Sequence, residues 1–110
     1  MKLERALRMS QTKVLFSNGT RPFLRAGGKL RFKVEGKGKS RIWTLYGVDR
    51  RGQELQVFVT ETGEPRVFRS ANATINYFMW LFPDRTRFSI PLVPGTHTDV
   101  EATQPETEQL

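Results

Sequence analysis

The stretch KLRFKVE at residues 29–35 alternates charged and apolar side chains with a period of two. Successive side chains of a β-strand point to opposite faces of its sheet, so the alternation predicts a strand with one apolar face and one mainly cationic face. The apolar side chains belong in a core, whereas the cationic ones are the first indication of function. The apolar residues are Leu30, Phe32 and Val34.

Positive charge gathers around this strand. Residues 21–51 hold ten basic and two acidic side chains, a local charge of +8, whereas the whole chain of 110 residues has a net charge of +7. Like charges repel one another, and a surface that gathers one sign commonly does so to bind a polyanion. The basic residues are Arg21, Arg25, Lys29, Arg31, Lys33, Lys37, Lys39, Arg41, Arg50 and Arg51.

Length and composition favour one domain. A chain of 110 residues with 37% hydrophobic residues can bury one modest core. It has no cysteine, which excludes disulfides and thiolate metal sites. No apolar run is long enough for a signal peptide or a membrane-spanning helix, so we expect a soluble cytoplasmic protein with no integral membrane association.

The pattern predicts an α+β fold, in which a small antiparallel meander of four to five strands carries one C-terminal helix packed on it. Residues 29–35 and 41–48 form a hairpin with a basic tip at 36–40, since the second segment is rich in β-branched and aromatic residues. Three further strands are expected at residues 12–16, 54–60 and 66–69. Residues 86–91 are expected to form either a last short strand or an extended segment, with Phe88 and Ile90 directed inward.

The helix is expected over residues 71–82, where no glycine or proline occurs before Pro83. Ser70 or Asn72 can cap it by accepting a hydrogen bond from a free backbone amide. A stripe at helical spacing is expected to pack on the sheet. It consists of Ile75, Phe78, Met79 and Phe82.

The two termini differ in charge. Residues 1–13 are basic and form either a short helix or an arm that orders on a partner, and both interpretations are open. Residues 14–93 are expected to form the domain. Residues 94–110 are acidic and nearly devoid of apolar side chains, which predicts a disordered tail that shields the basic surface.

Catalysis has little support in the sequence. The only histidine, His97, falls in the expected tail, where nothing would hold it as a catalytic base. The acidic residues are scattered over turns, and Gly36-Lys37-Gly38 lacks the spacing of a phosphate-binding loop. We therefore expect no catalytic residue, metal site, cofactor or small-molecule substrate.

The basic strand and hairpin tip form the predicted nucleic-acid site, in which cations contact phosphates. The alternative is a solvated sheet face, which is common in antiparallel sheets. Trp43 and Phe58 either stand among the cations, as a platform for stacking unpaired bases, or belong to a second core face. The predicted binding residues are Lys29, Arg31, Lys33, Lys37, Lys39, Arg41, Trp43, Arg50, Arg51 and Phe58.

The run YFMWLF at residues 77–82 would place apolar side chains all around a helix, which exceeds what packing on one sheet requires. The surplus is either buried under neighbouring segments or forms a homodimer interface. The predicted interface residues are Tyr77, Trp80 and Leu81.

The order of strands followed by a helix over residues 41–82, with RVFRSANATINY at 66–77 as the junction, resembles two families of small DNA-binding domains. These are the three-stranded-sheet domains of plant transcription factors and the arm-binding domains of integrases. It is similar in the same way to dimeric single-strand-binding coactivators with four strands and a helix. The resemblance implies a sheet that contacts DNA and a helix that supports it.

The sequence thus predicts a non-enzymatic nucleic-acid-binding protein, for DNA rather than RNA and with single-stranded and duplex targets both open, that acts through phosphate contacts. The alternative is a small assembly subunit, homodimeric or bound to another protein, that uses the aromatic helix as its interface. A third interpretation is peripheral binding of the basic N-terminus to anionic lipid.

Overall fold

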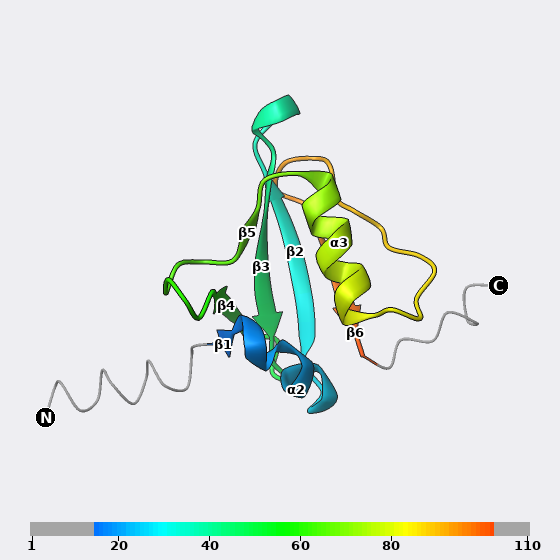
Figure 1. Ribbon diagram of the computed structural model, residues 1–110. Coiled ribbons are helices and arrows are strands. Elements are labelled where there is room, and N and C mark those ends of the chain that lie inside the picture. Colours follow the sequence, from blue (N-terminus) through cyan, green and yellow to red (C-terminus); the bar gives the residue numbers. More distant parts are fainter. Residues whose placement is uncertain (1–14, 103–110) are drawn as a thin grey trace, which may run out of the picture.

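A long antiparallel hairpin is the centre of the computed structural model, which describes residues 15–102 (Figure 1). Its strands are β2 (Lys29–Glu35) and β3 (Ile42–Val48), and every residue of β2 pairs with one of β3. The alternation within β2 is observed as expected, because its apolar side chains are fully buried while the charged ones lie on the other face. The buried side chains are Leu30, Phe32 and Val34.

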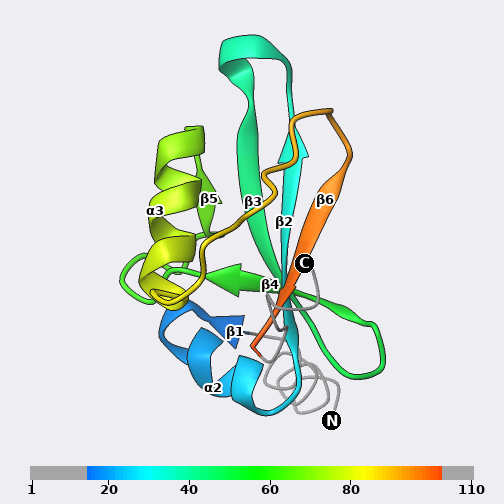
Figure 2. The same cartoon turned by 90° about the vertical axis from the view of Figure 1, so that its right-hand side faces the viewer.

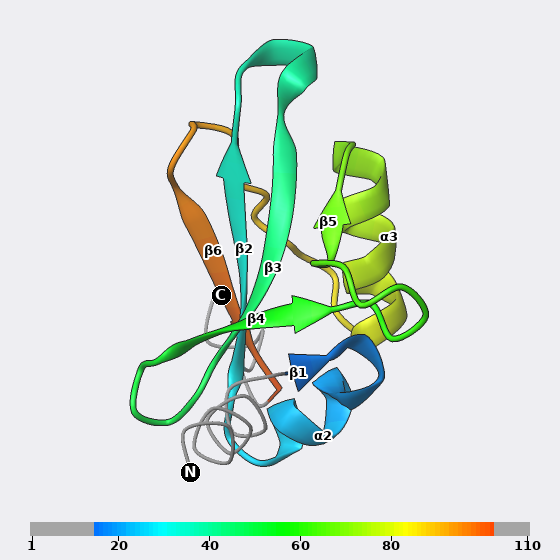
Figure 3. The ribbon, with the colours of Figure 1, turned by 90° about the vertical axis from the view of Figure 1, so that its left-hand side faces the viewer.

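The sheet is mixed, with strand order β1-β4-β3-β2-β6. β4 (Glu54–Phe58) pairs with β3 and then turns away, so that β5 (Val67–Phe68) takes the place beside the start of β3 (Figure 3). β1 (Leu15–Phe16) runs parallel to β4 at one edge. The α+β class is confirmed, but the expectation of a purely antiparallel meander is wrong.

The opposite edge of the sheet is β6 (His97–Glu101), which pairs antiparallel with β2. Its Val100 lies opposite Leu30 and is only 4% exposed. The expectation that disorder begins at residue 94 is therefore wrong for β6. The segment has the composition of a disordered tail, but it pairs along β2, buries Val100, and places Asp99 and Glu101 beside basic residues of β2. The expected N-terminal arm at 1–13 and the last part of the tail at 103–110 lie outside the described residues.

A short helix that the sequence analysis missed, α2 (Thr20–Arg25), connects β1 to β2 after the 3₁₀ turn η1 (Ser17–Gly19). Pro22 lies in its first turn, where no intrahelical amide bond is needed. Gly27 follows its end with φ of 101°, a conformation that favours glycine. The pair Asn18-Gly19, which favours a tight turn by itself, masks these signals in the sequence.

The long helix α3 (Ala71–Leu81) covers the apolar face of the hairpin (Figures 1 and 2). Ser70 caps it, since its Oγ accepts a hydrogen bond from the Ala73 amide at 3.0 Å. The helix is not C-terminal, because the chain continues to β6. The expected stripe is also displaced: Met79 is 51% exposed. The side chains that α3 buries are Thr74, Tyr77, Phe78 and Leu81.

The connection from α3 to β6 runs back along the sheet without pairing as a strand and closes one side of the core (Figure 2). The Phe88 ring stacks on Phe78 with centroids 4.3 Å apart and meets the edge of Phe32 at 5.2 Å. The Trp43 indole nitrogen donates a hydrogen bond to the Pro91 carbonyl oxygen at 2.8 Å. The expected inward placement of Phe88 is therefore observed.

Truncating Val100 should weaken the fold if β6 is part of the core. Val100→Ala removes two buried methyl groups and is expected to lower the free energy of unfolding by roughly 1.5–3 kcal/mol. Val93→Ala is the matched control, because Val93 is 64% exposed, and should change it by less than about 0.5 kcal/mol. Urea denaturation followed by circular dichroism measures both, and equal effects would contradict the packing of β6.

Candidate functional site

Arg31, at the centre of the predicted cationic face, is engaged by two carboxylates. Its Nε and Nη2 donate to the two carboxylate oxygens of Asp99, at 2.8 and 3.0 Å, and its Nη1 donates to Glu54 at 3.0 Å. Such forked pairs are among the stronger hydrogen bonds in proteins. The two acids come from β6 and β4, so the strands that flank the hairpin supply them.

The lysines on either side of Arg31 are paired as well. Lys33 Nζ lies 2.9 Å from Glu54 and 4.7 Å from the centre of the Tyr46 ring. Lys29 Nζ lies 3.6 Å from Glu101. Three cations of β2 are therefore matched by three carboxylates. The face expected to be strongly cationic is therefore close to neutral. The charge sum over residues 21–51 misses these three acids, because all of them follow that segment in the sequence.

The ion pairs hold the carboxylates in their charged form. The hydrogen bond from Arg31 lowers the pKa of Asp99, and the hydrogen bond from Lys33 lowers that of Glu54. The hydrogen bond to Asp99 in turn raises the pKa of Arg31 above its usual value. A phosphate that approached this face would have to displace these carboxylates.

Of the two aromatic residues expected at the site, one is buried. Trp43 is 3% exposed and belongs to the core that α3 covers, so the interpretation as a core residue applies to it. Phe58 lies on the outer face and is half-buried, with its ring 6.5 Å from that of Phe16. A platform built from Trp43 and Phe58 together is therefore not present.

The hairpin tip is different from the face, because its cations are exposed. Lys37 and Lys39 make no ion pair with any acid of the described residues. The tip extends beyond the rest of the sheet as a narrow two-stranded ribbon ending in η2 (Gly38–Ser40) (Figure 1). Arg41 holds its base, since its Nε donates to the Leu92 carbonyl oxygen at 2.8 Å.

The tip requires glycine at residue 36. Gly36 has φ of 84°, and a Cβ atom there would lie 2.4 Å from the Ser40 carbonyl oxygen. Gly36 therefore fixes the backbone of the tip that carries Lys37 and Lys39.

A second group of exposed cations lies at the other end of the hairpin, where α2 ends and β3 turns into β4 (Figure 3). Asp49 shapes this turn by accepting hydrogen bonds from the Arg51 and Gln53 amides, both at 2.9 Å. No carboxylate between residues 15 and 102 forms an ion pair with this group. It consists of Arg25, Arg50 and Arg51.

Only one of the predicted interface residues is accessible. Tyr77 and Leu81 are each 7% exposed and pack in the core, whereas Trp80 is 55% exposed. Arg21 covers its ring, with the guanidinium carbon 4.2 Å from the ring centre, and donates to the Trp80 carbonyl oxygen at 2.7 Å. An interface formed by all three residues would require α3 to leave the sheet.

His97 lies in β6, with its Nε2 3.9 Å from an Asp99 oxygen. His97 is therefore held by a strand and does not lie in a disordered tail, contrary to expectation. Within residues 15–102, no three His, Cys, Asp or Glu side chains come together as a metal site. No helix in the same range is long and apolar enough to cross a membrane.

No protein-family model, curated protein or solved structure matches this chain. The resemblances to DNA-binding domains find no support there, so function has to be argued from the geometry.

The Arg31–Asp99 pair should make stability depend on pH. Because folding lowers the pKa of Asp99 from its ordinary value of 3.8, its contribution is present above that value and is lost as the pH falls through the lower, folded value. Asp99→Asn is expected to lower the free energy of unfolding by about 1–3 kcal/mol at pH 7. The difference from wild type should shrink at about pH 3 and below.

Urea denaturation at the two pH values measures this effect. Glu64→Gln is the control, because it also neutralises a carboxylate, but one on an exposed turn. A loss for Asp99→Asn that is independent of pH, or equal to that of Glu64→Gln, would contradict a stabilising ion pair.

Proposed function

We propose that this protein binds nucleic acid through the two basic ends of the β2–β3 hairpin rather than through the face of its sheet. The main support for this proposal is the distribution of carboxylates over the surface of the hairpin. Carboxylates pair with the cations of the face, while the exposed cations at both hairpin ends have no acidic partner within residues 15–102. These five cations leave positive charge exposed at both ends of the hairpin.

The shape of the tip supports duplex DNA as the target. The major groove of B-form DNA is about 12 Å wide and admits a two-stranded β-ribbon, whereas the major groove of A-form RNA is too narrow for side chains to read. The projecting tip is such a ribbon (Figure 1). The burial of Trp43 removes one of the two stacking residues on which a preference for single strands would rest.

The second group of cations can contact the backbone beyond the groove. A strand of seven residues spans about 23 Å, so the two basic ends are separated by roughly that distance. Lys37 and Lys39 at the tip and Arg50 and Arg51 at the far turn would contact separate phosphates. Phosphate contacts position a protein without specifying a sequence, and no catalytic step is part of the proposal.

Removing the tip lysines should weaken binding and its dependence on salt. For Lys37→Gln/Lys39→Gln, the slope of the logarithm of the binding constant against the logarithm of salt concentration should become shallower by about 1.8. Binding itself should weaken roughly ten- to hundredfold at about 0.1 M salt. Fluorescence anisotropy of labelled duplex and single-stranded DNA, titrated at several salt concentrations, measures both quantities.

Lys29→Gln/Lys33→Gln is the matched control, because it removes the same charge from the paired face. This variant should change affinity and slope much less than the tip variant. Equal effects of the two variants would place the contacts elsewhere, and no binding of either DNA at low salt would refute the proposed function.

A further inference from the structure

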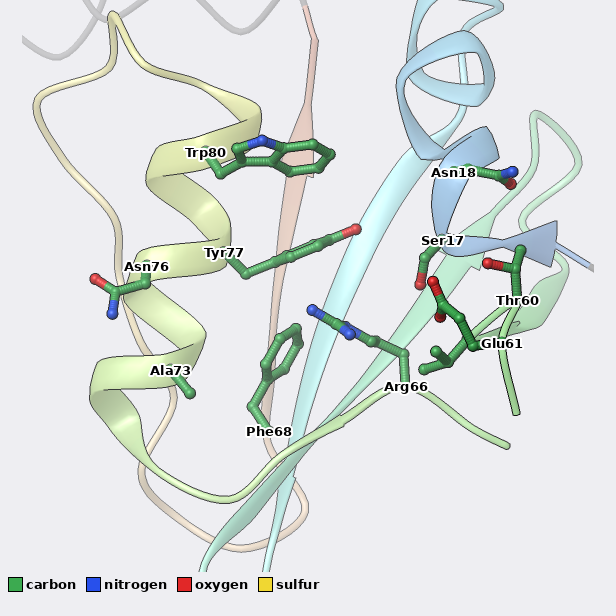
Figure 4. Close-up of a pocket in the computed structure, with 11 residues that line it drawn as sticks. Ser17, Asn18, Thr60, Glu61, Arg66, Phe68, Ala73, Asn76, Tyr77 and Trp80 are labelled. Atoms are coloured by element: carbon green, nitrogen blue, oxygen red, sulfur yellow. The ribbon is translucent and has the colours of Figure 1, made fainter. Parts of the chain in front are cut away.

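A groove of about 610 Å³ lies between α3, the connection from β4 to β5, and η1 (Figure 4). This volume falls in the range of small-molecule sites, about 300–1,000 Å³. The groove is formed by segments far apart in the sequence, and it includes none of the residues at the hairpin ends. It is therefore distinct from the proposed nucleic-acid site.

Arg66 is the central polar residue of this groove. Its backbone is fixed on both sides, since its amide donates to the Val57 carbonyl oxygen at 2.7 Å and its carbonyl oxygen accepts from the Leu45 amide at 3.1 Å. Figure 4 shows its side chain directed toward Tyr77. The guanidinium carbon lies 5.0 Å from the ring centres of both Phe68 and Tyr77.

Two buried polar atoms of the groove lack a hydrogen-bond partner in the described part of the chain. They are Nε of Arg66, a donor, and Oγ of Ser17, which can donate or accept. Buried polar groups in proteins are nearly always hydrogen-bonded, and an arginine donor left without an acceptor is costly. Both residues line the groove, so an oxyanion bound there would lie beside the Arg66 guanidinium and the Ser17 hydroxyl.

The wall of the groove is aromatic. The ring centres of Phe68 and Tyr77 are 5.1 Å apart, and those of Tyr77 and Trp80 are 5.8 Å apart. Because half of the Trp80 surface is exposed, this ladder presents apolar area to a ligand. Arg21, which lies over Trp80, adds a second positive charge close to this wall.

From these features we infer that the groove binds a small organic anion, with its carboxylate or phosphate oxygens on Arg66 and Ser17 and its apolar or aromatic body against Phe68, Tyr77 and Trp80. Arginine presents a planar fork of donors that suits both oxyanions. The inference departs from the expectation of no small-molecule substrate. It needs no reaction, only binding.

Glu61 provides a test of whether the groove binds an anion or a cation. It also lines the groove, from the exposed turn at residues 59–64, and Figure 4 shows it beside Ser17. Its charge opposes a bound anion. Glu61→Gln should therefore strengthen the binding of an anion, whereas it would weaken the binding of a cation.

The test uses matched probes on the full chain. Phenyl phosphate and phenylacetate provide the two oxyanions on one aromatic body, phenylacetamide is the neutral counterpart, and inorganic phosphate lacks the ring. Titrations followed by amide NMR shifts should give a dissociation constant of about 1 mM or tighter for at least one aromatic anion. The comparison of the two anions identifies the preferred oxyanion.

Substitutions then locate the site. Arg66→Gln should weaken binding of the aromatic anion about tenfold or more, and Arg66→Lys, which keeps the charge but loses the fork, should weaken it less. Arg69→Gln removes an exposed arginine nearby that does not line the groove, and should change binding by less than about twofold. Thermal unfolding shows whether each variant is folded. If Arg66→Gln does not fold, the weaker binding expected of Arg66→Lys provides the test.

Three results would overturn the inference. They are the absence of binding by any anionic probe, binding of phenylacetamide or inorganic phosphate as tight as that of the aromatic anions, and weaker anion binding by Glu61→Gln. Loss of DNA binding in Lys37→Gln/Lys39→Gln would not change the expected binding of the anions, because the groove and the tip have no residue in common.

Discussion

The structure depends on the burial of one face of β2. Its three alternating apolar side chains are fully buried and belong to one core cluster with side chains of β3, α3 and β6. α3 covers this surface, the connection after α3 closes its side through Phe88, and β6 extends it through Val100. Because side chains in a strand alternate, burying this face forces the charged face outward, where its charges must be balanced.

An element could be predicted from the sequence where its signal lies within the element itself. The period-two pattern of β2, the β-branched residues of β3 and the cap at Ser70 are local, and the corresponding elements were predicted nearly to the residue. β6 depends on pairing with a strand far away in the sequence, and its own composition resembles that of a disordered tail. α2 was concealed by an Asn-Gly pair that favours turns in isolation.

The candidate site shows the same division. Arg31 was correctly placed on the outer face of β2, but its partners Glu54 and Asp99 are 23 and 68 residues away. A charge sum over neighbouring residues cannot include them. Trp43 lies opposite Val34 in the hairpin, so the register of β2 and β3 places it on the core face. Net charge therefore leads to the hypothesis of a polyanionic partner, whereas topology decides which cations are exposed.

The same long-range packing creates the groove around Arg66. This arginine stands just before a two-residue strand and next to a turn, where the sequence gives no sign that it is more than a surface charge. Backbone hydrogen bonds with β3 and β4 fix its backbone, and its guanidinium lies against the rings of Phe68 and Tyr77. The buried Nε of Arg66 has no acceptor within the described residues, and packing on the two rings does not supply one, whereas a bound anion would offer acceptors to this guanidinium. Arg31 supports this argument by contrast, because there the fold itself supplies two carboxylates to a comparable guanidinium.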